Sequence, residues 1–243
     1  MTGGTLPAAH AAIQLAEVQF RWQARTPLVV DIPQLAVAAG ERLFLRGPSG
    51  SGKSTLLALL GGVVTPQHGT VEVLGQPLHR LGGARRDAFR ADYIGYIFQM
   101  FNLIPYLSVL DNVLLPCRFS RRRAERVAAR GDAHAEARRL LERLGLGGAL
   151  PARAATELSV GQQQRVAAAR ALLGGPELII ADEPTSALDA DHRAAFVELL
   201  LAECAALGST LVFVSHDRAL EPLFHRALCL TELNRAGTAA AQP

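Results

Sequence analysis

Residues 47–55, Gly-Pro-Ser-Gly-Ser-Gly-Lys-Ser-Thr, constrain the fold of this chain most, and they contain its only lysine, Lys53. The spacing G-x-x-x-x-G-K-[ST] is typical of a phosphate-binding loop, in which glycines allow successive backbone N–H groups to face phosphate oxygens. Lysine adds a compact point charge that arginine, the other cationic residue of this chain, does not provide. The residues predicted to bind phosphate are Gly47, Ser49, Gly50, Ser51, Gly52, Lys53, Ser54 and Thr55.

The sequence on both sides of this loop fits the same role. Residues 43–45 are consecutive apolar residues and predict a buried strand, and residues 54–60 predict a helix that ends at Gly61 and Gly62. The start of such a helix presents the positive end of its dipole to phosphate, and Ser54 offers a hydroxyl to Mg²⁺. A glycine-rich surface turn would not explain why strand, helix, lysine and hydroxyl occur together.

The size and composition of the chain indicate one globular α/β domain. It has 243 residues, of which 49% are hydrophobic and 19% charged, and its net charge of +3 gives no sign of a nucleic-acid surface. No apolar run approaches the ~20 residues of a membrane span, and the first residues lack the basic start and apolar core of a signal peptide. The three cysteines match no metal or disulfide spacing, so we expect small buried side chains in a reducing cytosol.

Short apolar segments predict the strands. Two alternating runs within residues 13–32, with residues 71–73, indicate half-buried antiparallel strands. Residues 178–181 and 211–214 are continuous apolar runs, which are typical of strands buried on both faces of a parallel sheet. Residues 94–98 indicate a further strand. In open parallel sheets ligands lie at the C-terminal strand ends, so polar residues that follow these strands are candidates for a site.

The middle of the chain predicts a helical insert over residues 107–145. Its apolar face is expected at Ala133, Ala137, Leu140, Leu141 and Leu144. The run of Arg121, Arg122 and Arg123 could contact anionic lipid or nucleic acid, but a solvated helix face is the commoner cause of such a run. Residues 236–243 are expected to be disordered.

Four further groups of polar residues stand at predicted element ends. Asp182 and Glu183 follow an apolar strand, and adjacent carboxylates are seldom structural because they repel each other unless a cation or hydrogen-bond donors compensate. Gln99 and His216 follow two other strands. Residues 158–162, Leu-Ser-Val-Gly-Gln, open a helix that runs to residue 173 and stops at Gly-Gly-Pro.

Together with residues 186–189, Ser-Ala-Leu-Asp, these groups resemble the motif set of the ATP-binding-cassette (ABC) ATPases, over almost the whole chain. The resemblance implies an α/β fold of the P-loop NTPase type, with a RecA-like parallel sheet core, an antiparallel β subdomain and a helical subdomain. The core and β subdomain would comprise residues 1–98 and 174–235, and the helical subdomain residues 99–173, within one ATPase domain.

The resemblance also implies the role of each site residue. Asp182 would bind Mg²⁺, partly through water, with Ser54 and Gln99 completing the surroundings of the metal. Glu183 would act as general base, and His216 would contact the γ-phosphate and hold the attacking water. Asp189 would lie in a loop through which two subunits sense each other.

The helix start at residues 158–162 would act across a dimer interface. Ser159 and Gly161, with Gln162 beside them, would bind the γ-phosphate of ATP held by the opposite subunit in a head-to-tail dimer. Ser159 and Gln162 also form a capping-box pattern, which would explain Ser159 by helix stability alone. Val160 stands where the family usually has glycine, so the two subunits would approach each other less closely.

An aromatic residue before the phosphate loop would stack on adenine in this family. Trp22 stands at that place, but Phe20 is two residues away and both could instead pack in the core. Residues 227–233 lack the Asp-Gly turn and the following strand that are common in relatives, so the C-terminal end is short.

Within the family, residues 93–105 and 110–113 look like those of the lipoprotein-release, macrolide-exporter and cell-division group. That group implies a permease partner with few spans and a large periplasmic part, a homodimeric ATPase, and a place at the cytoplasmic face of the inner membrane. Apolar residues within 101–115 would line a groove for the permease. Two alternatives are a soluble ABC ATPase that acts on nucleic acid or the ribosome, and a scaffold that binds ATP without hydrolysing it.

Overall fold

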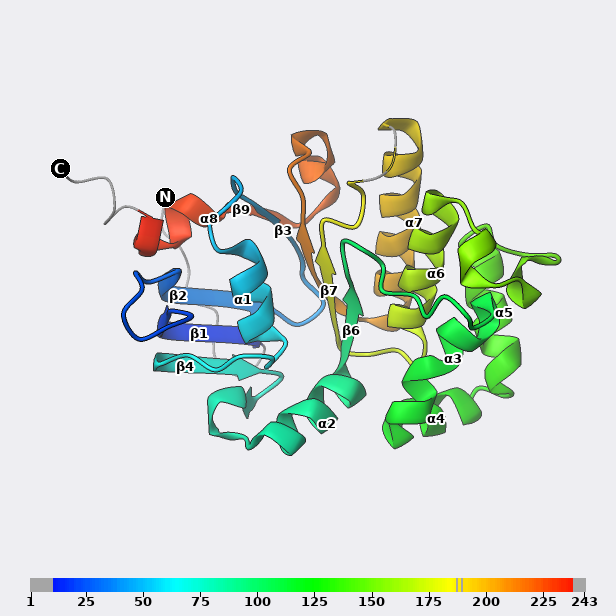
Figure 1. Ribbon diagram of the computed structural model, residues 1–243, viewed down its shortest axis with the longest axis horizontal. Coiled ribbons are helices and arrows are strands. Elements are labelled where there is room, and N and C mark those ends of the chain that lie inside the picture. The colour runs from blue at the N-terminus through cyan, green and yellow to red at the C-terminus, as the bar shows by residue number, and fades with distance from the viewer. Residues whose placement is uncertain (1–10, 187, 189, 238–243) are drawn as a thin grey trace. The chain divides into compact units, whose positions relative to one another are not determined.

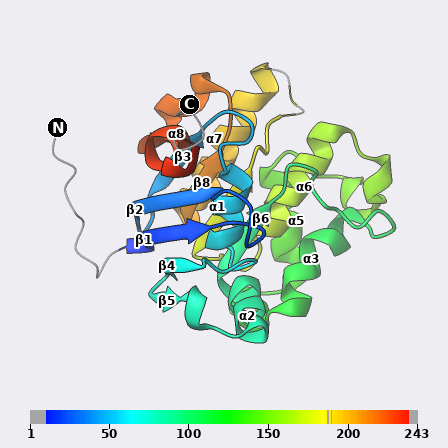
Figure 2. The same cartoon turned by 60° about the vertical axis from the view of Figure 1, so that its left-hand side comes forward.

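The computed structural model describes residues 11–186, 188 and 190–237. The chain divides into two compact units, here called the first unit, Met1–Asp87 with Val212–Pro243, and the second unit, Ala88–Leu211. Figures 1 and 2 show the course of the chain through both units.

An antiparallel sheet with the strand order β2-β1-β4-β5 belongs to the first unit (Figure 2). Its strands are β1 (Ala11–Phe20), β2 (Val30–Ala38), β4 (His68–Val73) and β5 (Gln76–Pro77). β1 pairs with β2 from Phe20↔Val30 to Ala11↔Ala38. Apolar side chains alternate with polar ones along much of β1 and β2, and the large apolar ones, such as Ile13, Val18 and Ile32, are buried. The predicted half-buried antiparallel strands are therefore confirmed.

A parallel sheet of five strands has the order β6-β7-β8-β3-β9. The strands are β3 (Arg42–Arg46), β6 (Ile94–Ile97), β7 (Leu178–Asp182), β8 (Thr210–Val214) and β9 (Arg226–Cys229). Four residues of β7 and all five of β8 are buried, as the continuous apolar runs predicted. The α/β fold with two kinds of sheet is thus confirmed.

Helices of the first unit are short. They are α1 (Lys53–Leu60), α8 (Leu230–Leu233) and the 3₁₀ turns η2 (Leu78–Arg80), η5 (Arg218–Leu223) and η6 (Arg235–Gly237). The predicted strand and helix around the phosphate loop are confirmed as β3 and α1. Residues 236 and 237 form part of η6, so their assignment to a disordered tail was wrong.

Most helices lie in the second unit. They are α3 (Val109–Phe119), α4 (Arg121–Ala128), α5 (Ala133–Arg143), α6 (Val160–Leu172) and α7 (Ala190–Leu207), with the 3₁₀ turns η3 (Leu150–Ala152) and η4 (Ala155–Glu157); α2 (Gly83–Tyr93) runs from the first unit into the second. The predicted apolar face is buried at Ala137, Leu140, Leu141 and Leu144. No helix among residues 11–186, 188 and 190–237 is long and apolar enough to span a membrane.

α6 packs closely on strand β6 within the second unit. A Cβ added to Gly95 of β6 would lie 2.3 Å from the carbonyl oxygen of Ala171, which is closer than real Cβ atoms approach a backbone oxygen. Glycine at this position therefore allows the helix to reach the strand.

The arginine run is not a uniformly solvated face, since Arg121 is exposed, Arg122 is half-buried and Arg123 is buried. Arg123 is only 2% exposed and donates to the carbonyl oxygens of Ile94 at 2.7 Å and of Ala171 and Leu173 at 3.4 Å. Burial lowers the pKa of Arg123 to about 10. The interpretation as a solvated run was correct only for exposed Arg121, because sequence spacing does not show what faces each side chain.

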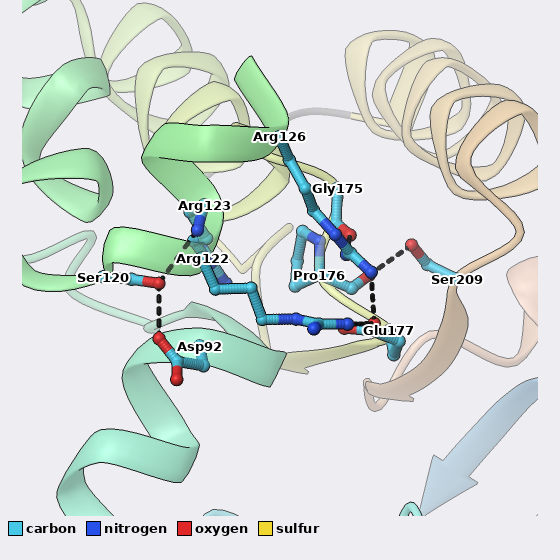
Figure 3. A network of polar contacts seen from close by, with 9 residues as sticks. All are labelled: Asp92, Ser120, Arg122, Arg123, Arg126, Gly175, Pro176, Glu177 and Ser209. Atoms are coloured by element: carbon cyan, nitrogen blue, oxygen red, sulfur yellow. Dashed lines mark hydrogen bonds and ion pairs between the residues drawn. The ribbon is translucent and has the colours of Figure 1, made fainter. Parts of the chain in front are cut away.

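Two neighbours of Arg123 fix the residue that precedes β7. Arg122 and Arg126 both donate to Oε1 of Glu177 at 2.6 Å, and Arg126 also donates to the carbonyl oxygen of Gly175 (Figure 3). The guanidinium of Arg122 lies over the ring of Tyr93, with 4.5 Å between its Cζ atom and the ring centroid. α4 thereby holds the start of the strand that ends at Asp182.

One further expectation from the sequence needs correction. Cys204 is buried, but Cys117 and Cys229 are only half-buried, so the expectation of three buried cysteines was wrong. The segment at residues 227–233 continues as helix α8 after β9.

Candidate nucleotide-binding site

The phosphate loop connects strand β3 to helix α1 in the first unit. Gly50 and Gly52 have positive φ angles of 81° and 97°, which L side chains rarely adopt. Gly52 is the N-cap of α1 and no side chain caps this helix start. The first amides of α1 are thus left for an anion, and the dipole of the helix favours one there.

Lys53 points back into the loop. Its ammonium donates to the carbonyl oxygens of Gly47 at 2.8 Å and Pro48 at 3.1 Å, and it lies 3.4 Å from Nε2 of His216. The side chain is only 7% exposed. The loop therefore holds one positive charge in a fixed place, which a flexible surface turn would not do.

Hydroxyl groups of the loop fit a phosphate ligand. The Oγ atom of Ser51 is buried and has no hydrogen-bond partner among the described residues. A buried hydroxyl without a partner costs free energy, and a phosphate oxygen in the loop would supply the missing acceptor. Ser54 is exposed at the first turn of α1, Thr55 beside it is buried, and Ser49 is exposed.

His216 comes from the other end of the first unit in sequence. It follows Ser215, whose backbone N–H donates to the carbonyl oxygen of Leu45 on β3 at 3.3 Å. The structure thus brings together three predicted site residues, Gly47, Lys53 and His216, although His216 lies 163 residues after the lysine.

Trp22 and Phe20 have different surroundings. Phe20 ends β1 and is 4% exposed, so its ring packs in the core, whereas Trp22 is 59% exposed in the connection to β2. Their rings meet edge to face with 5.1 Å between centroids. Core packing therefore accounts for Phe20, and Trp22 is the ring that can contact a ligand.

Asp182 and Glu183 stand at the end of β7 in the second unit. Burial and the charge of Asp182 both raise the pKa of Tyr96 on neighbouring β6. β6 and β7 are parallel and pair up to Ile97↔Ala181, so Gln99, two residues past β6, leaves the same sheet edge as the carboxylates. Gln99 is exposed there.

Glu183 has an unusual backbone conformation with φ of +46°. Non-glycine residues in this left-handed region cost roughly 1–2 kcal/mol, and such strain concentrates at functional sites. The turn continues with a hydrogen bond from the N–H of Ser186 to the carbonyl oxygen of Glu183.

The start of α6 carries the other predicted nucleotide contacts. Ser159 Oγ accepts from the N–H of Gln162 at 3.3 Å, and Gln162 Oε1 accepts from the N–H of Ser159 at 3.0 Å. The capping box is therefore confirmed. Ser159 and Val160 are exposed and Gly161 is half-buried, so this helix start faces outward from the second unit.

Sequence reasoning missed Arg170, on the same helix as Ser159. Arg170 donates to the carbonyl oxygens of Phe101 at 2.5 Å and Asn102 at 2.6 Å, both of which have positive φ angles. It thereby fixes the backbone that follows Gln99. Helical spacing could have suggested that Arg170 lies inward, but not that it contacts this loop.

Other site predictions remain as they were. Asp189 lies outside the described residues. Ser54 belongs to the first unit, whereas Gln99 and Asp182 belong to the second, so the magnesium site made from all three stays a prediction.

Comparisons with known proteins identify the family. The family model described as ABC transporter matches residues 30–186, which is more than half of the chain. The ABC transporter ATP-binding protein YbbA of Escherichia coli K12 is 43% identical over 201 residues, covering 81% of this chain and 83% of YbbA. The lipoprotein-releasing system ATP-binding protein LolD of Shewanella sp. MR-4 is 40% identical over 205 residues, covering 84% and 86%. A macrolide export ATP-binding/permease protein also matches.

Solved structures agree with these relatives. The dimeric ATP-binding cassette MJ0796, in a post-hydrolysis state bound to ADP and Pi, superposes with a TM-score of 0.79 at 32% identity and covers 92% of this chain and 95% of that one. The fold, the family and the bound nucleotide of this solved cassette thus match those expected from the motifs of the present chain. The chain therefore belongs to the ABC transporter family and is an ATPase of the kind that forms the ATP-binding subunits of these transporters.

Proposed function

We propose that this ATPase forms a dimer with two ATP molecules between its subunits and that ATP binding and hydrolysis drive a partner permease. The observation that carries the proposal is the position of the Lys53 ammonium, held between the carbonyls of Gly47 and Pro48 and next to His216. A single buried cation at an uncapped helix start suits the β and γ phosphates of a nucleotide.

The residues of the two units then have distinct tasks. Lys53 and His216 bind the phosphates, and Trp22 stacks on the base. Glu183 takes a proton from the attacking water, because it is the carboxylate next to the one that faces the metal. Mg²⁺ would be held by Ser54, Gln99 and Asp182 and would neutralise phosphate charge.

The proposed dimer uses the start of α6 as its second contact with ATP. Ser159, Gly161 and Gln162 lie at a capped helix N-terminus, which is favourable for an anion, and Ser159 is exposed. The solved cassette similar to this chain is a dimer. We propose that residues 99–173 act as a helical subdomain that carries this helix start toward the other subunit.

The permease would bind the apolar residues within 101–115. Leu103, Ile104 and Leu107 are half-buried and Tyr106 is exposed, whereas Phe101 is buried and is therefore no longer a candidate for this surface. We propose that this contact with a permease of few spans and a large periplasmic part places the ATPase at the cytoplasmic face of the inner membrane.

Substitution of a charged residue for an apolar one within residues 101–115 tests whether this surface binds the permease. Leu103→Glu or Ile104→Glu should release the protein from membranes in cells that contain its partners, because a carboxylate opposes docking of an apolar helix. Nucleotide affinity should stay at the wild-type value.

Leu199→Glu is the matched control, since Leu199 is a partly exposed leucine on α7. This variant should remain membrane-bound. Folded groove variants that sediment with membranes as well as wild type would contradict the proposal and favour the soluble class that acts on nucleic acid.

A further inference from the structure

Asn234 follows helix α8 and is buried at 5% exposure. Its Nδ2 donates to the carbonyl oxygens of Val29 and Ser51, both at 2.9 Å. Its Oδ1 accepts from the backbone N–H of Asp31 at 2.7 Å and of Ala236 at 3.2 Å. An amide has two donor hydrogens and two lone pairs, so every hydrogen-bonding position of this side chain is used.

The partners of Asn234 come from distant parts of the first unit. Ser51 belongs to the phosphate loop, and Val29 and Asp31 flank the start of β2, directly after the connection that contains Trp22. They lie 183 to 205 residues before Asn234 in the chain. One side chain thus ties the loop to the strand that follows the exposed tryptophan.

The loop backbone packs tightly at the same place. A Cβ added to Gly52 would lie 2.8 Å from the carbonyl oxygen of Val29 and 3.2 Å from Nδ2 of Asn234. The residue before β2 and Asn234 therefore pack against Gly52 so closely that a side chain would not fit at this position. A shift of Asn234 would be transmitted to the loop directly.

The hydrogen bond to Ser51 also fixes the orientation of a peptide group. The carbonyl of Ser51 and the N–H of Gly52 belong to one planar trans peptide, so they point in opposite directions. Because Asn234 holds the carbonyl, the N–H of Gly52 points away from Asn234. In a phosphate loop, such N–H groups are the ones that bind phosphate.

We propose that Asn234 is a positioning residue for nucleotide binding, which sets the orientation of the Ser51–Gly52 peptide and joins the phosphate loop to the Trp22 connection. This inference rests on the proposed phosphate-loop role of Lys53. Asn234 acts through the loop, so its loss affects nucleotide affinity more than the hydrolysis step.

Asn234→Asp in the full-length protein is the sharpest test. The change keeps the size of the side chain and its acceptor, but it places a carboxylate oxygen against the carbonyls of Val29 and Ser51. We expect the Kd of a fluorescent ATP analogue to rise about tenfold or more, the scale of one lost hydrogen bond. The kcat at saturating ATP should stay within about threefold, and Asn234→Ala should shift Kd in the same direction.

Arg226→Gln is the matched control. Arg226 also ties the C-terminal segment to β2, through the carbonyl oxygen of Ala36, and pairs with Glu41, and neither of these partners belongs to the phosphate loop. This variant should lower the melting temperature without changing Kd. Lys53→Ala separates the two proposals, because it should lose affinity whether or not Asn234 positions the loop.

Three results would overturn the inference. The first is a wild-type Kd in folded Asn234 variants when Lys53→Ala has lost affinity. The second is a loss of affinity in Arg226→Gln that equals the loss in the Asn234 variants. Failure of both Asn234 variants to fold would assign this residue to the stability of the unit as a whole. Unchanged affinity in Lys53→Ala would instead refute the phosphate-loop assignment itself.

Discussion

The ammonium nitrogen of Lys53 lies 3.4 Å from Nε2 of His216, although 163 residues separate the two side chains. Lysine has only donors, so a hydrogen bond between these two atoms would have Nε2 of His216 as its acceptor. The two residues that the family assigns to the terminal phosphate are therefore neighbours within one unit.

Replacing Lys53 tests how closely the loop fits an ammonium. Lys53→Ala should raise the Kd of ATP by about tenfold to a hundredfold, the range of a lost charged hydrogen bond. Lys53→Arg should lose affinity as well, because a planar guanidinium does not fit between the carbonyls of Gly47 and Pro48. Titration with a fluorescent ATP analogue measures both, and circular dichroism checks that each variant is folded. Wild-type affinity in the arginine variant would show that charge alone suffices.

Glu183→Gln should separate ATP binding from hydrolysis. The amide keeps the shape of the side chain but cannot accept the proton of water, so turnover should fall by about a hundredfold or more. ATP should then hold the dimer together, which size-exclusion chromatography with ATP detects. A variant that hydrolyses ATP near the wild-type rate would move the general base elsewhere.

Glu183→Gly is the companion variant for backbone strain. Glycine adopts a φ of +46° without strain, so the free energy of unfolding should rise by about 1 kcal/mol while turnover is lost. Chemical denaturation measures the first effect and phosphate release the second. A less stable glycine variant would mean that the turn is not strained.

Mixing two inactive variants tests whether Ser159 acts on the opposite subunit. Ser159→Arg and Lys53→Ala would each disable both sites of their own dimers, but a mixed dimer retains one complete site. Phosphate release should therefore recover in part on mixing. Absence of activity in mixed dimers, shown by differential tagging, would argue against the head-to-tail arrangement.

Trp22 should contribute to nucleotide affinity while Phe20 should not. Stacking of a base on an aromatic ring is worth about 1–3 kcal/mol, so Trp22→Ala should raise Kd by about tenfold or more. Phe20→Leu should lower the melting temperature with little change in Kd, since this ring is in the core. The emission of Trp22, the only tryptophan, should also change when ATP binds.

Arg123 should matter for stability and Arg121 should not. Arg123→Met leaves the carbonyls of Ile94, Ala171 and Leu173 without their donor and should cost about 2–4 kcal/mol, or about 5–10 °C in melting temperature. Arg121→Met is the control within the same helix, because its side chain is exposed. Equal melting temperatures for the two variants would contradict the structural role of Arg123.

The parts of the fold that follow from local pattern were predictable. Consecutive apolar residues in β7 and β8 need two buried faces, and the glycine spacing of residues 47–55 needs a loop, whatever the rest of the chain does. Ser159 and Gln162 are three residues apart, so their capping box is also local.

The features that escaped prediction depend on partners far along the chain. Arg122 and Arg123 differ from Arg121 only through contacts with residues such as Glu177 and Ile94. No pattern around Asn234 shows that it meets Ser51, since that contact exists only after the two ends of the first unit have come together. The turn at residues 236 and 237 depends on the same side chain, because the N–H of Ala236 donates to Oδ1 of Asn234, which contacts with Val29, Asp31 and Ser51 hold in place.

Lys53 carries the only ε-amine of the chain, and its place in the phosphate loop gives that amine a practical meaning. A reagent that acylates amines and is small enough to enter the empty loop should add one mass increment at Lys53, and bound nucleotide should protect this position. Mass spectrometry of the intact protein could then report what fraction of its sites is filled at a given moment. The protein thus carries its own occupancy label, without any engineered probe.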